Sequence, residues 1–203
     1  KTKFGRSIAA RIALAKGPPI SRRGPTREGL PMDGIRHCRM FAAYNSWANG
    51  RLYDAAELLS DEEWERDVHA FFGSMCGTLN HILVADRIWM NRFTGTGETH
   101  RVLSDVPHPH FGDLRRERGA LDDRIADWVD TLNEETLQGL FSYVPVTNPK
   151  EVTQQLAPAL SHLFNHQTHH RGHAHMILSV LGHEPPSLDL IYFLRSNDGK
   201  GFI

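Results

Sequence analysis

The segment from Ser74 to Phe93 is apolar around most of its circumference when its residues are placed at helical spacing. A helix of this kind must be covered on nearly every side, which is the position of a central helix in a bundle. Gly95 follows closely and is the residue type that commonly ends a helix. The sequence therefore predicts a central helix. Its apolar positions are Met75, Leu79, Ile82, Leu83, Val84, Ala85, Ile88, Trp89 and Met90.

Three further segments repeat apolar residues at the spacing of amphipathic helices, and the last of them stops at Gly182. Together with 74–93 they make four long helices, which predict an all-α fold and an antiparallel four-helix bundle. A capping box at Ser60 and Glu63 predicts a further short helix. The three segments cover about residues 35–59, 113–132 and 157–181.

A short stretch before the last long helix has the pattern of strands instead. Residues 140–146 and 151–155 flank an Asn-Pro turn at 147–150, which predicts a short β-hairpin. After the last long helix, residues 185–195 offer one apolar turn with Ser187 as its cap.

Residues 1–31 differ in composition from the rest, with eight basic residues, one acidic residue and a Gly/Pro-rich end. We interpret them as a flexible or non-native basic extension that supplies no metal ligand, with a targeting peptide as the alternative. Residues 32–196 are expected to form a single bundle domain, and 197–203 a loose polar tail.

The composition excludes several classes of function. The formal net charge of −1, from 24 acidic and 23 basic residues, argues against a nucleic-acid-binding protein. No apolar run approaches the roughly 18 residues of a membrane span. The two cysteines are too few for a disulfide framework, so we expect a cytoplasmic protein. The sequence lacks the Gly-x-Ser-x-Gly motif of serine hydrolases, a phosphate-binding loop and the His-Glu-x-x-His motif of zinc peptidases.

Histidine is concentrated on the last long helix, where five of the thirteen histidines lie between residues 162 and 173. At ~100° per residue, His166 and His170 point furthest toward the apolar face of that helix. Three others lie at the margin of that face, and His175 points outward. The three at the margin are His162, His169 and His173.

Two histidines at positions i and i+4 on an inward face place their ring nitrogens near one point, as in two-histidine zinc helices. A buried imidazole needs partners, and either a divalent cation or hydrogen bonds at a helix interface would supply them. The spacing alone leaves these two readings about even. A third ligand must come from elsewhere, and His81 on the central helix is the candidate, although periodicity leaves its direction undecided. Asp86 is a second polar residue there, either supporting the site or forming a salt bridge.

Two segments resemble the signature segments of the DinB/YfiT-like metalloprotein family. They are Thr78-Leu-Asn-His-Ile-Leu-Val-Ala-Asp86 and His162-Leu-Phe-Asn-His-Gln-Thr-His-His-Arg-Gly172, and the resemblance extends over roughly residues 34–195. It implies an up-down-down-up four-helix bundle, usually dimeric, in which His81, His166 and His170 bind one divalent metal. The family usually has Gln where this chain has His173, which leaves an extra ligand or a proton-transfer group open beside an interface residue.

Three neutral imidazoles leave open coordination positions, which is the pattern of catalytic metal sites. Characterised members of the family that this chain resembles are thiol-dependent transferases and isomerases. The resemblance therefore implies a small thiol and an electrophile as partners. Arg171 and His173 are auxiliary candidates, with a structural salt bridge as the alternative for Arg171. Zinc is the best guess for the metal, with nickel or another divalent ion as alternatives. The rival interpretation is a non-enzymatic metal-binding stress-response protein.

Two further expectations concern the cysteines and the oligomeric state. Cys38 and Cys76 are candidates for a thiolate ligand or nucleophile, but isolated cysteines in apolar helices are more often core residues. Large apolar residues on the first two long helices exceed what one small bundle is expected to bury, which predicts a homodimer. Those residues are Phe41, Trp47, Trp89 and Met90.

Overall fold

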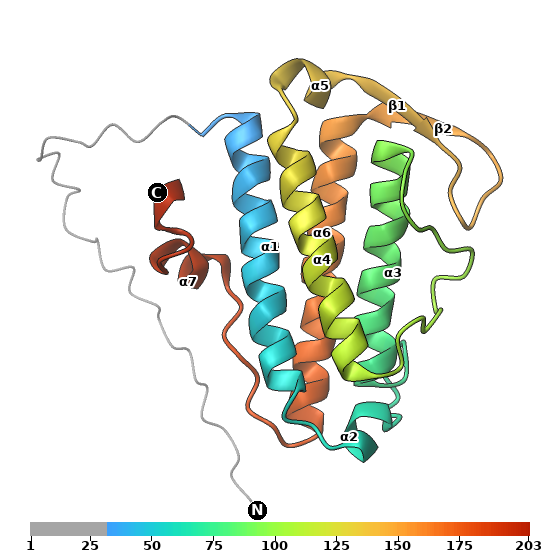
Figure 1. The fold of residues 1–203 in the computed structure, drawn as a ribbon, viewed down its shortest axis with the longest axis vertical. Helices are drawn as coiled ribbons and strands as arrows, with labels where there is room; N and C mark the ends of the chain where they lie inside the picture. Colours follow the sequence, from blue (N-terminus) through green and yellow to red (C-terminus); the bar gives the residue numbers. More distant parts are fainter. Residues whose placement is uncertain (1–31) are drawn as a thin grey trace, which may run out of the picture.

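The computed structural model describes residues 32–203, so the basic segment 1–31 lies outside the described residues. Four long helices pack side by side along most of its length (Figure 1). The all-α four-helix bundle predicted from the sequence is confirmed. The four helices are α1 (Gly34–Ala56), α3 (Met75–Thr94), α4 (Phe111–Asp130) and α6 (Leu156–Val180).

The order of helix directions is up-down-down-up. In Figure 1, α1 and α6 run one way along the bundle, whereas α3 and α4 both run the other way. Because α3 and α4 are consecutive and parallel, residues 95–110 must return along the whole bundle before α4 begins. A 20-residue helix is about 30 Å long, and a 16-residue connection can span at most about 50 Å. We call residues 95–110 the crossover loop.

Two helices that begin with a capping side chain start where the sequence predicts. Ser74 caps α3 by accepting a hydrogen bond from the Gly77 amide, and Gly95 ends it in the left-handed region with φ 69°. The capping box predicted at Ser60 and Glu63 opens α2 (Asp61–Glu65). The structure adds the one-turn helix α5 (Glu134–Gln138), which is too short to show helical periodicity.

Two predicted boundaries were wrong. Helix α7 (Leu190–Arg195) follows Asp189 rather than Ser187, because the Leu188 carbonyl accepts the Tyr44 hydroxyl at 2.7 Å and is turned toward α1. The hairpin is shorter than predicted: β1 (Leu140–Tyr143) pairs with β2 (Val152–Gln155) in antiparallel register. Pro145 has no amide hydrogen for the ladder, which explains why the first strand does not continue to residue 146.

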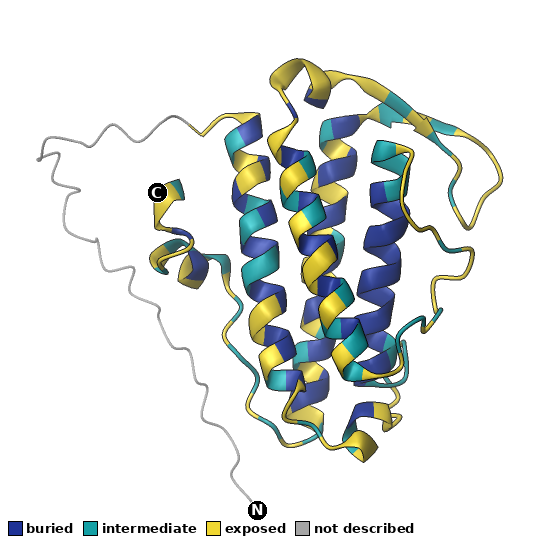
Figure 2. Ribbon diagram, in the orientation of Figure 1, coloured by how far each residue is buried: buried dark blue, intermediate teal, exposed yellow. Residues whose placement is uncertain are grey.

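The core is centred on α3, as the sequence predicts. Figure 2 shows this helix buried along almost its whole length, whereas the other long helices alternate buried and exposed stripes. Met90 is fully buried and Trp89 nearly so. On α1, Phe41 and Trp47 pack in a smaller cluster that includes Phe193 of α7. Phe41 and Trp47 are only partly buried within one chain, and the homodimer stays a prediction.

The C-terminal tail makes defined contacts with the domain. Residues Lys200–Phe202 form the 3-10 turn η1, and the Phe202 ring lies 6.1 Å from that of Phe193. Arg36 on α1 donates a hydrogen bond to the Gly201 carbonyl at 2.9 Å. The sequence predicted a loose tail here, and these contacts attach it to α1 and α7.

A buried polar network crosses the bundle between α3, α4 and α6. The Asp86 carboxylate on α3 accepts hydrogen bonds from Arg118 of α4 and from the Gln167 side chain of α6, each at 2.6 Å. Arg118 also pairs with Asp122 at 2.9 Å, and all four side chains are buried. Asp86 is therefore a salt-bridge partner rather than a companion of the histidines.

The same network reaches α1 through two asparagines. Asn49 donates to Asp122 at 3.0 Å, and Arg171 of α6 donates to the side-chain oxygens of Asn45 and Asn49. All four long helices are thus connected by buried polar contacts, which fixes their relative register. Within the described residues, no helix is long and apolar enough to cross a membrane.

Candidate metal centre

The structure brings His81, His166 and His170 together in the bundle, and we call these three residues the buried trio. One nitrogen atom from each lies within 4.8 Å of the others. His81 comes from the middle of α3, and His166 and His170 lie one turn apart on α6. The Nε2 atoms of His81 and His170 are 3.2 Å apart. His81 and His170 are buried, and His166 is half-buried, so the trio extends toward the surface.

The orientation of His81 is fixed from two sides. Its Nδ1 atom lies 2.8 Å from the carbonyl oxygen of Leu103, in the crossover loop. A carbonyl can only accept, so Nδ1 carries the proton and Nε2 keeps the free electron pair that a metal ligand requires. The ring of Phe72 stacks on the His81 ring with centroids 3.8 Å apart. A histidine held in one tautomer by a backbone carbonyl is typical of metal sites.

The stacking of Phe72 depends on a close backbone approach at Gly77. A Cβ atom at this position would lie 2.1 Å from the Phe72 carbonyl oxygen. Only glycine lets the turn before α3 lie so close to the first turns of that helix. The glycine in Cys76-Gly-Thr78 therefore allows Phe72 to reach the ring of His81.

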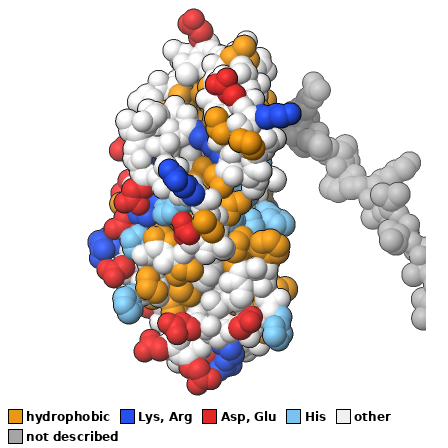
Figure 3. All heavy atoms as spheres, turned by 90° about the vertical axis from the view of Figure 1, so that its right-hand side faces the viewer, with side chains coloured by type: hydrophobic (Ala, Val, Ile, Leu, Met, Phe, Trp, Pro, Cys, Tyr) orange, Lys and Arg blue, Asp and Glu red, His pale blue; other side chains and the backbone are white. Residues whose placement is uncertain are grey.

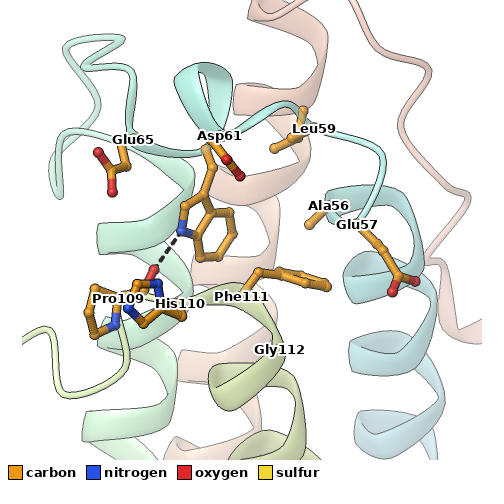
Figure 4. Close-up of a pocket in the computed structure, with 10 residues that line it drawn as sticks. Ala56, Glu57, Leu59, Asp61, Glu65, Pro109, His110, Phe111 and Gly112 are labelled. Carbon is orange, nitrogen blue, oxygen red and sulfur yellow. Dashed lines mark hydrogen bonds between the residues drawn. The ribbon is translucent and has the colours of Figure 1, made fainter.

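Two side chains hold the crossover loop near its α4 end. Asn80, the neighbour of His81, donates to the His108 carbonyl at 2.9 Å and accepts from the His108 amide at 3.0 Å. The Trp64 indole donates to the Pro109 carbonyl at 2.8 Å, beside Phe111 at the start of α4 (Figure 4). These contacts position the loop that carries the Leu103 carbonyl.

Burial keeps the trio uncharged near neutral pH. Burial first, and then the neighbouring histidines, lower the pKa of His170 to about 3 and that of His166 to about 4. The pKa of His81 is also lowered, chiefly by burial. Neutral imidazole is the form that binds metal, so the trio is in its ligand form at neutral pH.

The geometry of the trio fits a metal ion. Two nitrogens that each bind zinc at ~2.0–2.1 Å in a tetrahedral arrangement lie about 3.3 Å apart, close to the 3.2 Å between His81 and His170. The Nδ1 atoms of His166 and His170 are buried without a hydrogen-bond partner in the described chain. Buried polar atoms without partners are costly, so this cluster has unfilled bonding capacity.

Arg171 lies next to the trio in sequence but points into the polar network. Its side chain is 2% exposed and donates to Asn45, Asn49 and Gln167. Its guanidinium also lies 5.2 Å from the centre of the Tyr44 ring. Within the described residues Arg171 forms no salt bridge with a carboxylate, and its hydrogen bonds are to neutral side chains. Arg171 therefore joins α6 to α1, and its placement does not support contact with a co-substrate.

The two cysteines lie outside the buried trio. Cys38 and Cys76 are both buried, and burial raises the pKa of each thiol to about 11. Both are therefore protonated near neutral pH and poor nucleophiles. Their placement supports the reading as core residues.

A hollow of about 500 Å³ opens beside α3 on the face formed by the crossover loop and the hairpin. Arg92, Arg101 and Tyr143 are among its lining residues, and Ile88 lies in its wall seven residues after His81. Figure 3 looks onto this side of the molecule and shows hydrophobic, basic and acidic side chains intermixed, with histidines near mid-height. The residues that line the hollow include two arginines and none of the buried trio.

The chain is a four-helix bundle in which the consecutive helices α3 and α4 run parallel, and three of its histidines converge in a candidate metal centre. The sequence matches the DinB family over residues 35–200, and the chain belongs to that family. Protein DinB of Bacillus subtilis (strain 168) is 22% identical over 171 residues, which cover 74% of this chain and 90% of the relative.

Two solved structures share the fold. A DinB-like protein from Bacillus cereus superposes with a TM-score of 0.55 at 15% identity, covering 70% of this chain and 90% of the other. YfiT from Bacillus subtilis superposes with a TM-score of 0.57 at 12% identity, covering 82% and 97%. YfiT is described as a probable metal-dependent hydrolase with an unusual four-helix bundle topology.

Sequence reasoning missed the groups that orient His81. Phe72 precedes the helix in an irregular turn, where no periodicity indicates what its ring contacts. Leu103 acts through its backbone oxygen, which leaves no side-chain signal at all. The one available hint was Gly77, because a glycine inside an otherwise apolar helix often marks a close backbone approach.

Proposed function

We propose that the chain binds one divalent metal ion through His81, His166 and His170 and is a metal-dependent enzyme that transfers a small thiol to an electrophile. The observation that carries the proposal is the convergence of three neutral imidazoles with no acidic group among them. Within the described residues, no carboxylate or cysteine is grouped with the buried trio. Three protein ligands are the pattern of catalytic sites, whereas closed four-ligand shells are structural.

The three histidines supply nitrogen ligands only, which suit zinc, nickel and copper, and zinc is the first choice. When bound, such an ion supplies a positive charge that favours the deprotonated form of a nearby thiol. The chain's own residues keep the three histidines in the uncharged form that binds metal. The Leu103 carbonyl keeps the proton of His81 on Nδ1, and burial keeps His166 and His170 uncharged.

Within the part of the chain that the structure describes, no carboxylate is grouped with the trio, which favours thiol transfer over reactions that need a separate general base. The buried acids Asp86 and Asp122 are engaged by Arg118. In the proposed reaction the thiol loses its proton and its sulfur forms a bond to the electrophilic carbon. In a substitution that carbon releases its leaving group with the bonding electron pair; in an addition the electron pair of the broken bond moves to a neighbouring atom, which takes up the proton. The hollow lined by Arg92 and Arg101 is the proposed place for an anionic part of either reactant.

The test compares metal-loaded wild type with His170→Ala in a panel of cellular thiols and small electrophiles. Wild type is expected to accelerate at least one thiol addition or substitution, and the variant is not. A parallel panel of esters and amides without thiol tests hydrolysis, the activity named for YfiT. Equal rates for both proteins in every assay would favour the non-enzymatic metal-binding alternative. Thiol-independent turnover lost in His170→Ala would identify a hydrolase instead.

A further inference from the structure

A second histidine cluster adjoins the buried trio. His169, His170 and His173 also place one nitrogen atom each within 4.8 Å of the others. The rings of His169 and His173, one turn apart on α6, have centroids 4.4 Å apart. His169 is exposed and His173 is half-buried, so this cluster faces solvent. We call it the outer cluster.

The outer pair is free to bind a ligand. Neither the His169 nor the His173 side chain forms a hydrogen bond with another group of the described chain, and their ring contacts are with each other and with His170. Two histidines at i and i+4 on a helix present their nitrogens to one point. Solvated surface histidines are the ordinary alternative, but these two stand beside a third imidazole rather than alone.

His170 belongs to both clusters. Its ring lies 4.3 Å from that of His166 and 4.4 Å from that of His81 on the inner side. On the outer side it lies 4.7 Å from His169 and 5.1 Å from His173. Its Nε2 atom faces His81, whereas its Nδ1 atom is buried without a partner. A ligand that changes its partners at His170 would pass from the solvent side to the buried side of α6.

We propose that His169 and His173 form a second, exposed site for a divalent metal ion, and that the shared His170 makes it the entry site for the buried trio. This inference rests on one part of the proposed function, namely that the trio is the final binding site of the ion. Two like charges at neighbouring sites repel each other, so the outer site is the weaker one once the trio is filled. Its role is to capture the ion from solvent and deliver it inward.

The test measures zinc binding and loading in the full chain with a chromophoric chelator as competitor. Wild type is expected to bind two zinc ions, one that resists the chelator and one that it removes. His169→Gln/His173→Gln is expected to lose only the weakly held ion and to fill the resistant site more slowly in stopped-flow mixing. The matched control, His162→Gln/His175→Gln, removes two histidines from the same helix outside both clusters and should behave as wild type.

Each outcome decides the proposal. Wild-type stoichiometry in His169→Gln/His173→Gln, or an unchanged loading rate after loss of the weak ion, overturns it. Loss of the resistant ion in that variant, with helical content unchanged by circular dichroism, also overturns it, because the tight site would then be the outer cluster. His166→Ala separates the two proposals: it should lose the resistant ion and keep the weak one, so the entry site can be established even if the trio proves to lack catalytic activity.

Discussion

The Nε2 atoms of His81 and His170 lie 3.2 Å apart although 89 positions separate the two residues in the chain. They sit on α3 and α6, which run in opposite directions, so the register between these helices decides whether they meet. A second contact between the same helices, from Gln167 to Asp86 at 2.6 Å, lies about one turn away. The buried polar network therefore aligns the helices that carry the histidines.

The first prediction concerns the ligand set. His166→Ala should lose the chelator-resistant metal ion while the bundle stays folded, because the half-buried site tolerates a smaller side chain. Metal content of protein purified without an affinity tag, measured together with circular dichroism, checks this. His175→Gln on the same helix is the control and should keep its metal. Full metal retention in His166→Ala would remove His166 from the site.

The second prediction concerns the pH dependence of the metal-free protein. His166 and His170 have folded-state pKa values of about 4 and about 3, below the value of ~6.5 expected in the unfolded chain. Between these values the unfolded chain binds more protons, so the free energy of unfolding decreases as pH falls from about 6.5 toward 4. Urea unfolding in a chelator at pH 7.5, 6 and 5 measures the decrease. His166→Gln/His170→Gln should show a shallower dependence, and equal slopes would contradict the assignment.

The third prediction concerns the buried ion pairs. Arg118→Met leaves Asp86 and Asp122 without their cation, and breaking a buried pair in this way costs ~3–5 kcal/mol. Arg115→Met, three residues earlier on α4, removes a pairing with the exposed Asp54 and Glu57 and should cost ~0–1 kcal/mol. Urea unfolding of the two variants measures the difference. Similar losses for both would mean that the network adds little to stability.

The fourth prediction tests the packing beneath His81. Gly77→Ala places a methyl group against the Phe72 carbonyl and should push the Phe72 ring away from His81. Losing a group that orients a metal ligand typically lowers metal affinity ~10–100-fold, and competition with a chelator measures this. Gly119→Ala in α4 meets no atom within 4 Å and should stabilise the fold by ~0.5–1 kcal/mol without changing metal affinity. Unchanged affinity in Gly77→Ala would argue against a role for the Phe72 contact.

The sequence predicted the long helices well because burial leaves a periodic trace. The facing of His166 and His170 followed from the same periodicity, and the structure places His170 in the core and His166 at its edge. His81 was different, because a helix apolar on all sides gives no direction, and its selection came from the family resemblance. For Arg171 the sequence misled in another way. Its charge suggested contact with a co-substrate, but in the structure its guanidinium donates hydrogen bonds to four neutral side chains inside the bundle.

The use of a backbone oxygen to orient His81 has a consequence for how this protein can diverge. Every amino acid carries the same carbonyl, so a substitution at Leu103 leaves the hydrogen bond to His81 available as long as the crossover loop keeps its path. The Leu103 side chain is 36% exposed and Val102 is 52% exposed. Descendants of one ancestral sequence can therefore exchange the side chains of this loop, and with them the molecules they admit, while inheriting the same three histidines.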